Sequence, residues 1–176
     1  QKSLRNKIGY ISQKATLFSG TIASNVAFGD SNTQIANEDV ENAIKTAQAW
    51  EFVKNKESGV DSYVAQGGAN LSGGQKQRLS IARAIARKPE ILIFDDSFSA
   101  LDYKTDKMLR DALDKECKDS TRIIVAQRIG TIRDADRIIV LDEGKIVGQG
   151  KHAELMQNCD VYRQIAYSQL SKEELE

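Results

Sequence analysis

The chain has 176 residues, and its 25 Lys and Arg residues balance 25 Asp and Glu residues, so the formal charge is zero. With 40% hydrophobic residues, the composition fits one soluble globular domain and argues against intrinsic disorder. The balanced charge disfavours nucleic acid as the main partner, because binding a polyanion needs a basic surface. No apolar run approaches the roughly 18 residues that cross a bilayer, so membrane contact is expected only through a partner or a further segment.

The two cysteines, Cys117 and Cys159, lie far apart in the sequence and form no CxxC pair. The sequence therefore predicts neither a zinc site nor a disulfide framework, and a reducing, cytosolic setting is the default expectation. Cys117 ends an apolar helical stripe and is predicted to be a core thiol.

In chain order, residues 8–12 predict the first strand. Apolar side chains then recur at helical spacing over residues 21–56 with no convincing strand among them, which predicts a small helical subdomain. Residues 75–87 predict an amphipathic helix whose basic side chains are interpreted as a solvated face. These basic side chains are Arg78, Arg83, Arg87 and Lys88.

The apolar run over residues 91–94, set off by Pro89, predicts a central parallel strand covered on both faces, with Asp95 at its carboxyl end. A second amphipathic helix is expected from residue 103 to about residue 117. The strand-like runs alternate with helical patterns, and this alternation predicts an α/β fold.

The last part of the chain carries a strand signal over residues 122–126 and then two short apolar runs, 137–141 and 145–148. The two runs flank a turn signal and predict a hairpin. Residues 151–170 predict one helix.

The most specific motif is Leu-Ser-Gly-Gly-Gln over residues 71–75, directly before the basic helix. Glycines let backbone N–H groups approach a phosphate, and the amino end of a helix is electropositive. Ser72 and Gln75 add side-chain partners, so the motif is interpreted as an anion site. For a generic Ser-Gly-Gly the alternative, a glycine turn that opens a helix, is the commoner case.

With its continuation KQRLSIARAIARKPEILIFDD, this motif resembles the signature of the nucleotide-binding domain of ABC transporters. The strand ending at Asp95 resembles the Walker B strand, residues 99–102 resemble the D-loop, and Gln13 stands where the Q-loop glutamine belongs. Residues 15–22 are typical of exporters. The resemblance covers nearly the whole chain and implies a RecA-like P-loop NTPase core, here partial, with a small α-helical subdomain.

The resemblance also implies a division of the chain within one such domain. Residues 1–20 would form a core strand and the Q-loop, residues from about 21 to 88 the helical subdomain with the signature, and residues from about 89 to 176 the core with the Walker B, D-loop and switch regions. No window matches the P-loop pattern GxxxxGK[ST]. The chain is therefore expected to begin after the P-loop, and these 176 residues alone are expected not to bind Mg-ATP measurably.

The family resemblance implies ATP and Mg²⁺ as cofactors and assigns roles to individual residues. Asp95 would hold Mg²⁺ through water, and Gln13 would offer an oxygen to the metal and an amide to the attacking water. The nucleotide-binding residues would be Ser72, Gly73, Gly74, Gln75 and Asp102. An isolated aspartate would more often be a capping carboxylate, and an isolated glutamine an exposed loop amide. The Q-loop, signature, Walker B and D-loop motifs occur here in the family's order, and this removes that preference.

Two residues depart from the family pattern at the predicted catalytic site. Asp96 stands where the family has a catalytic glutamate, and its side chain is shorter by one C–C bond, about 1.5 Å. Gln127 stands where the family has a switch histidine, and it cannot become cationic near neutral pH. These changes predict a weakened site. His152, the only histidine, is interpreted as a structural residue of a turn or first helical turn.

In the family, two nucleotide-binding domains meet head to tail, and each site combines Walker motifs of one with the signature of the other. The resemblance therefore implies a second nucleotide-binding domain and the coupling helices of transmembrane domains as partners, at the cytoplasmic face of the cell membrane. Asp96 and Gln127 suggest a heterodimeric exporter in which this chain supplies the degenerate site. Two alternatives stay open: a non-hydrolysing ATP sensor that gates or clamps a partner, and, least favoured, a soluble ABC protein of DNA repair or translation.

Overall fold

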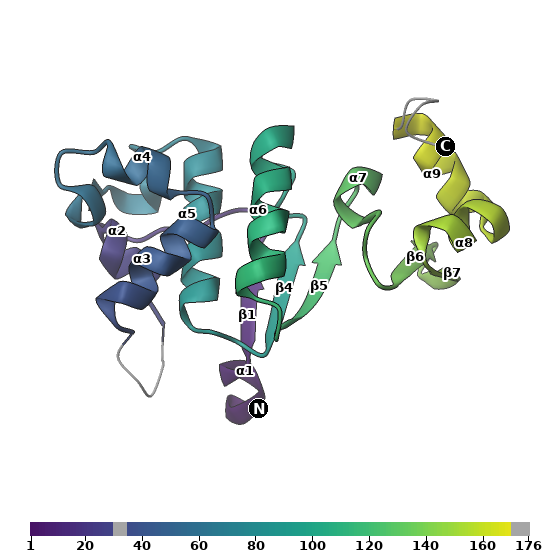
Figure 1. Cartoon of the computed structure of the whole chain (residues 1–176), viewed down its shortest axis with the longest axis horizontal. Coiled ribbons are helices and arrows are strands. Elements are labelled where there is room, and N and C mark those ends of the chain that lie inside the picture. Colours follow the sequence, from purple (N-terminus) through teal and green to yellow (C-terminus); the bar gives the residue numbers. More distant parts are fainter. Residues whose placement is uncertain (30–34, 170–176) are drawn as a thin grey trace. The chain divides into compact units, whose positions relative to one another are not determined.

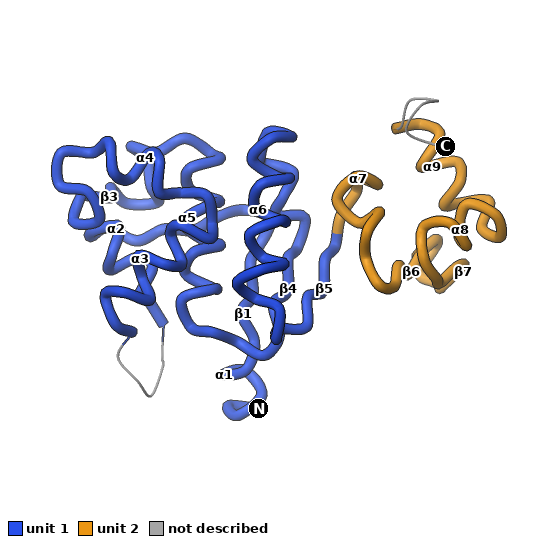
Figure 2. Tube along the Cα trace, viewed as in Figure 1, with its two compact units in different colours: residues 1–125 blue, residues 126–176 orange. Residues whose placement is uncertain are grey.

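The computed structural model describes residues 1–29 and 35–169. The chain forms two compact units, residues 1–125 and 126–176, which Figure 2 shows in different colours. The two units do not follow the predicted division at residues 20 and 88, so that division stays a prediction. Within the described residues, no helix combines the length and the apolar character needed to cross a membrane.

The first unit is built on a three-stranded parallel sheet in the order β1-β4-β5. The strands are β1 (Ile8–Ile11), β4 (Ile91–Asp95) and β5 (Thr121–Val125), as seen in Figure 1. The prediction of a central parallel strand ending at Asp95 is confirmed. Because all three strands run in the same direction, the residues that follow β1 and β4 meet at one edge of the sheet, called the carboxyl edge below.

One face of this sheet packs into the apolar core, together with side chains of α5 (Gly73–Ala86) and α6 (Tyr103–Glu116). Leu92 and Phe94 of β4 are fully buried, whereas Ile91 and Ile93, which point to the opposite face, are only partly buried. The expectation that β4 is covered on both faces is therefore wrong for the described chain. The uninterrupted apolar run concealed the alternation that the pleat imposes.

Among the described residues, the helical region expected over residues 21–56 is present and extends to Gly68. Its elements are α2 (Ile22–Val26), α3 (Asn37–Thr46), α4 (Trp50–Lys54) and the short 3₁₀ turns Gly59–Asp61 and Gln66–Gly68. The sequence did not indicate the two-residue strands β2 (Gly20–Thr21) and β3 (Tyr63–Val64), which pair antiparallel. Strands this short carry no readable periodicity. A short helix, α1 (Lys2–Asn6), precedes β1.

The second unit contains α7 (Ile129–Ile132), the hairpin β6 (Ile138–Asp142) with β7 (Lys145–Gly150), α8 (His152–Asn158) and α9 (Asp160–Gln169). The antiparallel pairing of β6 and β7 confirms the predicted hairpin. Its two turn residues, Glu143 and Gly144, both have positive φ (47° and 75°), as a tight hairpin turn requires.

The predicted single helix at the end of the chain is instead two helices, α8 and α9, separated at Cys159. Cys159 has an extended backbone (φ −128°, ψ 104°), so α8 ends with its N–H bonded to the Leu155 carbonyl and α9 begins with its carbonyl bonded to the Arg163 N–H. Its thiol lies against Gly148 of β7, where an added Cβ would be only 2.7 Å from the Cys159 Sγ. This close packing of the cysteine onto the hairpin explains a break that helical periodicity does not reveal.

Candidate functional site

Three predicted site residues, Gln13, Asp95 and Asp96, come together at the carboxyl edge. Gln13 lies two residues beyond β1, and the aspartates end β4 and follow it. The Gln13 side chain donates a hydrogen bond from Nε2 to Asp96 Oδ2 at 2.9 Å. Residues 83 positions apart in sequence are thus in direct contact because β1 and β4 are neighbouring parallel strands.

The backbone of Asp96 is held on both sides. Its N–H donates to the Val125 carbonyl at 2.9 Å, and its own carbonyl accepts from Ser99 Oγ at 2.7 Å. Asp96 has a φ of 47°, a left-handed conformation that aspartate tolerates better than most residues. The chain therefore turns sharply at this residue while its carboxylate contacts Gln13.

The Asp95 carboxylate has a partner that the sequence did not indicate, Tyr10 of β1. The Tyr10 hydroxyl donates to Asp95 Oδ2 at 2.7 Å. This hydrogen bond, with smaller contributions from burial and from the Asp95 charge, raises the pKa of Tyr10. Tyr10 pairs with Ile93 across the strands, so its side chain lies diagonal to Asp95 on the same sheet face. Only the strand register could have revealed this contact.

The glycine-rich motif opens α5, as predicted, with Ser72 as its N-cap. Ser72 Oγ accepts from the Gln75 N–H at 3.3 Å, and Gln75 Oε1 accepts from the Ser72 N–H at 3.0 Å. This reciprocal capping box occupies the two side chains that were expected to bind an anion. In this arrangement an anion would meet Gly73 and Gly74, and a Cβ added to Gly73 would contact nothing within 4 Å. The anion-binding role of residues 72–75 stays a prediction.

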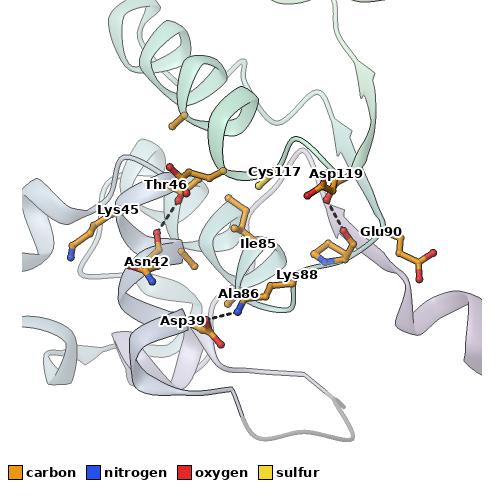
Figure 3. Close-up of a pocket in the computed structure, with 15 residues that line it drawn as sticks. Asp39, Asn42, Lys45, Thr46, Ile85, Ala86, Lys88, Glu90, Cys117 and Asp119 are labelled. Atoms are coloured by element: carbon orange, nitrogen blue, oxygen red, sulfur yellow. Dashed lines mark hydrogen bonds and ion pairs between the residues drawn. The ribbon is translucent and has the colours of Figure 1, made fainter.

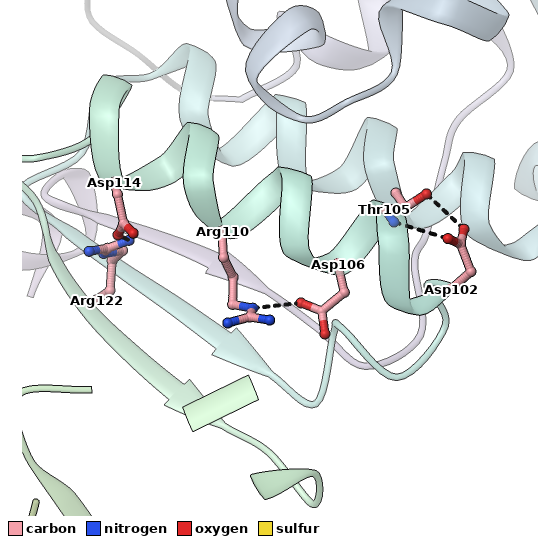
Figure 4. A network of polar contacts seen from close by, with 6 residues as sticks. All are labelled: Asp102, Thr105, Asp106, Arg110, Asp114 and Arg122. Carbon is pink, nitrogen blue, oxygen red and sulfur yellow. Dashed lines mark hydrogen bonds and ion pairs between the residues drawn. The ribbon is translucent and has the colours of Figure 1, made fainter. Parts of the chain in front are cut away.

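Asp102, a predicted nucleotide-binding residue, is the N-cap of α6. Figure 4 shows its carboxylate accepting from the Thr105 N–H at 3.0 Å and from Thr105 Oγ1 at 2.7 Å. These hydrogen bonds lower the pKa of Asp102. Further along α6, Arg110 pairs with the buried Asp106, and Asp114 pairs with Arg122 of β5. Asp102 thus has a structural role here, and its nucleotide contact stays a prediction.

Two basic residues of α5 do not form the solvated face expected from the sequence. Arg78 and Arg83 are partly buried, and burial lowers the pKa of each guanidinium. Arg78 donates to the Gln48 carbonyl at 2.7 Å and lies 5.0 Å from the centre of the Phe52 ring. The arginine stems cross an apolar surface and their heads bind carbonyl groups of other elements. Lys88 agrees better with the prediction, since it is exposed and pairs with Asp39.

Gln127 and His152 belong to the second unit. Gln127 follows β5 by two residues, and its carbonyl accepts from the Gln169 side chain at 2.7 Å. Its predicted action together with Asp96 stays a prediction. His152 is the first residue of α8, as expected, and its Nδ1 lies 2.8 Å from the Tyr162 hydroxyl. Burial, the largest cause, lowers the pKa of His152 and favours a neutral, structural ring.

The donor chemistry of the carboxyl edge fits Mg²⁺ carried by a phosphate ligand. Asp95 and Asp96 offer carboxylate oxygens, and Gln13 retains an amide oxygen because its Nε2 makes the bond to Asp96. Mg²⁺ commonly binds through one or two carboxylates plus substrate phosphates and waters. Among the described residues, no group of three or more His, Cys, Asp or Glu side chains is placed to hold a metal without such a ligand.

A cavity of about 740 Å³ lies elsewhere in the first unit and is drawn in Figure 3. It is lined by residues of α3, the end of α5 and the end of α6, together with Pro89 and Glu90. Pro89 and Glu90 directly precede β4, so the cavity lies at the amino end of that strand. Gln13, Asp95 and Asp96 do not line it.

Comparisons with known proteins agree with this geometry. The family model for the ABC transporter matches residues 1–99. An uncharacterised ABC transporter ATP-binding protein of Mycobacterium tuberculosis is 46% identical over 167 residues, which cover 94% of this chain and 28% of that protein. The ATP-dependent lipid A-core flippase of Vibrio vulnificus is 41% identical over 164 residues, covering 93% of this chain and 28% of that protein.

Among solved structures, a bacterial Atm1-family ABC exporter with ATP bound is similar, with a TM-score of 0.90 and 34% sequence identity. The match covers 97% of this chain and 30% of the exporter chain. The α/β, RecA-like fold expected from the sequence is therefore confirmed. The chain spans less than a third of the length of these relatives. Since the family model covers more than half of its residues, the chain belongs to the ABC transporter family and corresponds to the ATP-binding domain of its exporters.

Proposed function

We propose that this chain is part of an ATPase that drives export across a membrane. The observation that carries the proposal is the hydrogen bond between Gln13 and Asp96 at the carboxyl edge, beside Asp95. An amide and two carboxylates from neighbouring strands converge at this edge, where open α/β sheets bind their ligands. The similarity to an exporter solved with ATP and to an ATP-dependent flippase supports the same activity.

In this proposal each edge residue has a distinct task. Asp95 would hold Mg²⁺ through water, and Tyr10 fixes the orientation of the Asp95 carboxylate. Gln13 would present its amide oxygen to the metal or its amide to the attacking water, and Asp96 would take the proton of that water as it attacks the γ phosphate and ADP leaves. Bound Mg²⁺ would supply charge neutralisation between the β and γ phosphates.

The proposal extends to a second nucleotide-binding domain. Residues 72–75 at the start of α5, together with Asp102 at the start of α6, would complete the nucleotide site of that partner. The backbone N–H groups of Gly73 and Gly74 are the contacts proposed for its terminal phosphate. The complex would lie at the cytoplasmic face of the membrane, with the coupling helices of transmembrane domains as further partners.

Asp96 and Gln127 lead us to propose that the partner is a different subunit and that this chain supplies a slow site. A general base must reach its water, and the shorter aspartate withdraws the carboxylate. Glutamine in place of histidine removes a group that can take up a proton near neutral pH. ATP would then remain bound at this site while the partner's site turns over.

The ATPase proposal is tested by the Asp95→Asn substitution in the intact protein. Loss of the carboxylate charge should lower the rate of ATP hydrolysis at this chain's own site by about 10- to 100-fold, the usual effect of changing a residue that acts on a metal through its shell. Asp111→Asn, at an exposed position of α6, is the matched control and should leave the rate unchanged. Hydrolysis that is equally fast in both variants would contradict the proposed role of the carboxyl edge.

A second candidate function is a subunit that binds ATP without hydrolysing it. Asp96 favours this function because its side chain is shorter than glutamate, and Gln127 favours it because it cannot take up a proton near neutral pH. Asp96→Glu and Gln127→His, alone and together, distinguish the two functions in the intact complex. An increase in hydrolysis at this site of about 10-fold or more in the double variant supports the slow-ATPase proposal. Unchanged turnover in all three variants supports the sensor.

A further inference from the structure

Arg83 of α5, in the continuation of the signature motif, has three hydrogen bonds to residues that precede this helix. Its guanidinium donates from Nη1 to the Thr16 carbonyl at 2.8 Å and from Nε to the Asn25 carbonyl at 2.7 Å. A third bond runs from Nη2 to Asn25 Oδ1 at 3.1 Å. The planar fork of arginine can reach these acceptors together, whereas a lysine ammonium on its flexible stem cannot match the geometry.

The acceptors of Arg83 are themselves firmly placed. Asn25 is buried, and its amide nitrogen donates to the Phe18 and Thr21 carbonyls at 2.8 and 3.0 Å. The Phe18 N–H in turn donates to Asn25 Oδ1 at 2.8 Å. The rings of Phe18 and Phe28 lie 5.5 and 5.6 Å from the guanidinium carbon of Arg83. Arg83 therefore binds the segment after Gln13 to a rigid part of the helical region.

A second anchor on the same helix binds the residue before Gln13. Gln77 is only 1% exposed, and its Nε2 donates to the Ser12 carbonyl at 3.1 Å. Buried amides are placed where their hydrogen bonds can be satisfied, and this one reaches across 65 positions of sequence. Two side chains of α5 thus hold the chain at Ser12 and again at Thr16.

We propose that Gln77 and Arg83 are positioning residues that set the place of the Gln13 side chain against Asp96. The two carbonyls that they hold, those of Ser12 and Thr16, are four residues apart on either side of Gln13. Gln13 therefore has little freedom, and the position of α5 determines where its amide lies. Because α5 begins at the Ser72–Gln75 motif, a ligand bound there would act on Gln13 through the same rigid helix. This last consequence rests on the proposed function; the anchoring of Gln13 does not.

Hydrogen exchange measured by mass spectrometry on the intact protein tests the anchoring directly. Gln77→Met keeps the volume and removes the donor, and Arg83→Lys keeps the charge and removes the fork. Each variant should speed exchange of the peptide covering residues 13–18 by about fivefold, the effect of one lost hydrogen bond. In the double variant, exchange of this peptide should be faster than in either single variant.

Arg78→Lys is the matched control, because Arg78 lies on the same helix and bonds the Gln48 and Gly74 carbonyls instead. It should leave exchange of residues 13–18 unchanged. The proposal is overturned if exchange there is unchanged in the Gln77 and Arg83 variants. It is equally overturned if exchange rises by the same factor throughout the protein, because that would indicate general destabilisation.

Steady-state kinetics give a second readout. If the anchors position Gln13, Gln77→Met and Arg83→Lys should lower kcat for ATP hydrolysis at this chain's own site by about 10-fold and change KM for ATP there by less than about twofold, since a small misplacement mainly affects the reacting geometry. An unchanged kcat at this site would overturn the positioning role. A wild-type protein that does not hydrolyse ATP would contradict the proposed function, while the exchange data would still decide whether the anchors exist.

Discussion

The carboxyl edge and the amino ends of α5 and α6 hold almost all the predicted site residues, but they are built in different ways. At the carboxyl edge, Gln13 meets Asp96 and Tyr10 meets Asp95 across more than 80 residues of sequence. At the helix ends, Ser72 bonds Gln75 and Asp102 bonds Thr105, three residues apart. The first region depends on the whole sheet being assembled, and the second on local backbone geometry alone.

A match to a sequence motif and a structural role are therefore separate properties of a residue. A serine or an aspartate before a helix satisfies backbone donors whether or not a ligand binds. A side-chain contact between segments that follow two neighbouring strands does not satisfy helix-end donors in this way. The Gln13–Asp96 contact is therefore the stronger evidence for a functional site, and the hydrogen bonds of Gln77 and Arg83 on either side of Gln13 support it.

The largest expected effect comes from removing a long-range anchor. Arg83→Met should lower the free energy of unfolding by about 3 kcal/mol, because the carbonyls of Thr16 and Asn25 lose their donors in a partly buried setting. Urea unfolding of the intact protein measures the change. Arg87→Met, near the end of the same helix, is the control and should change stability by less than about 0.5 kcal/mol. Similar losses in both variants would contradict the special role of Arg83.

A smaller effect is expected from breaking a local cap. Ser72→Ala should lower the free energy of unfolding by about 1 kcal/mol, the usual cost of losing an N-cap side chain. In the capping box the bonds are reciprocal, so adding Gln75→Ala should cost less in the Ser72→Ala background than in the wild type. Fully additive losses in thermal unfolding would show that the two side chains act independently.

The smallest effect is expected at Tyr10, which is 58% exposed. The hydrogen bond to Asp95 raises the pKa of Tyr10 above its ordinary value of 10.0. A raised pKa means that the bond stabilises the fold fully below pH 10.0 and that this contribution is lost as the pH rises through the folded-state pKa. The stability difference between wild type and Tyr10→Phe should therefore shrink in unfolding measurements made at increasing alkaline pH. A difference that grows above pH 10.0 would contradict the bond.

Much of the fold could be predicted because its signals are local. The apolar run before Asp95 indicated the central strand, and the turn between the runs 137–141 and 145–148 indicated the hairpin. The motif over residues 71–75 marked the start of α5. The break at Cys159 and the pairing of β2 with β3 could not be predicted, because one depends on packing against Gly148 and the other on strands of only two residues.

For the candidate site, the sequence by itself determined which residue types are present and where strands and helices end. Through the family resemblance, it therefore assigned Gln13, Asp95 and Asp96 to one predicted metal and catalytic site. Only the tertiary structure decided that Tyr10 bonds Asp95 and that Gln77 and Arg83 hold the chain on both sides of Gln13. The physical reason is that such contacts depend on strand register and helix rotation, which place residues far apart in sequence within hydrogen-bonding distance and leave no periodic pattern along the chain.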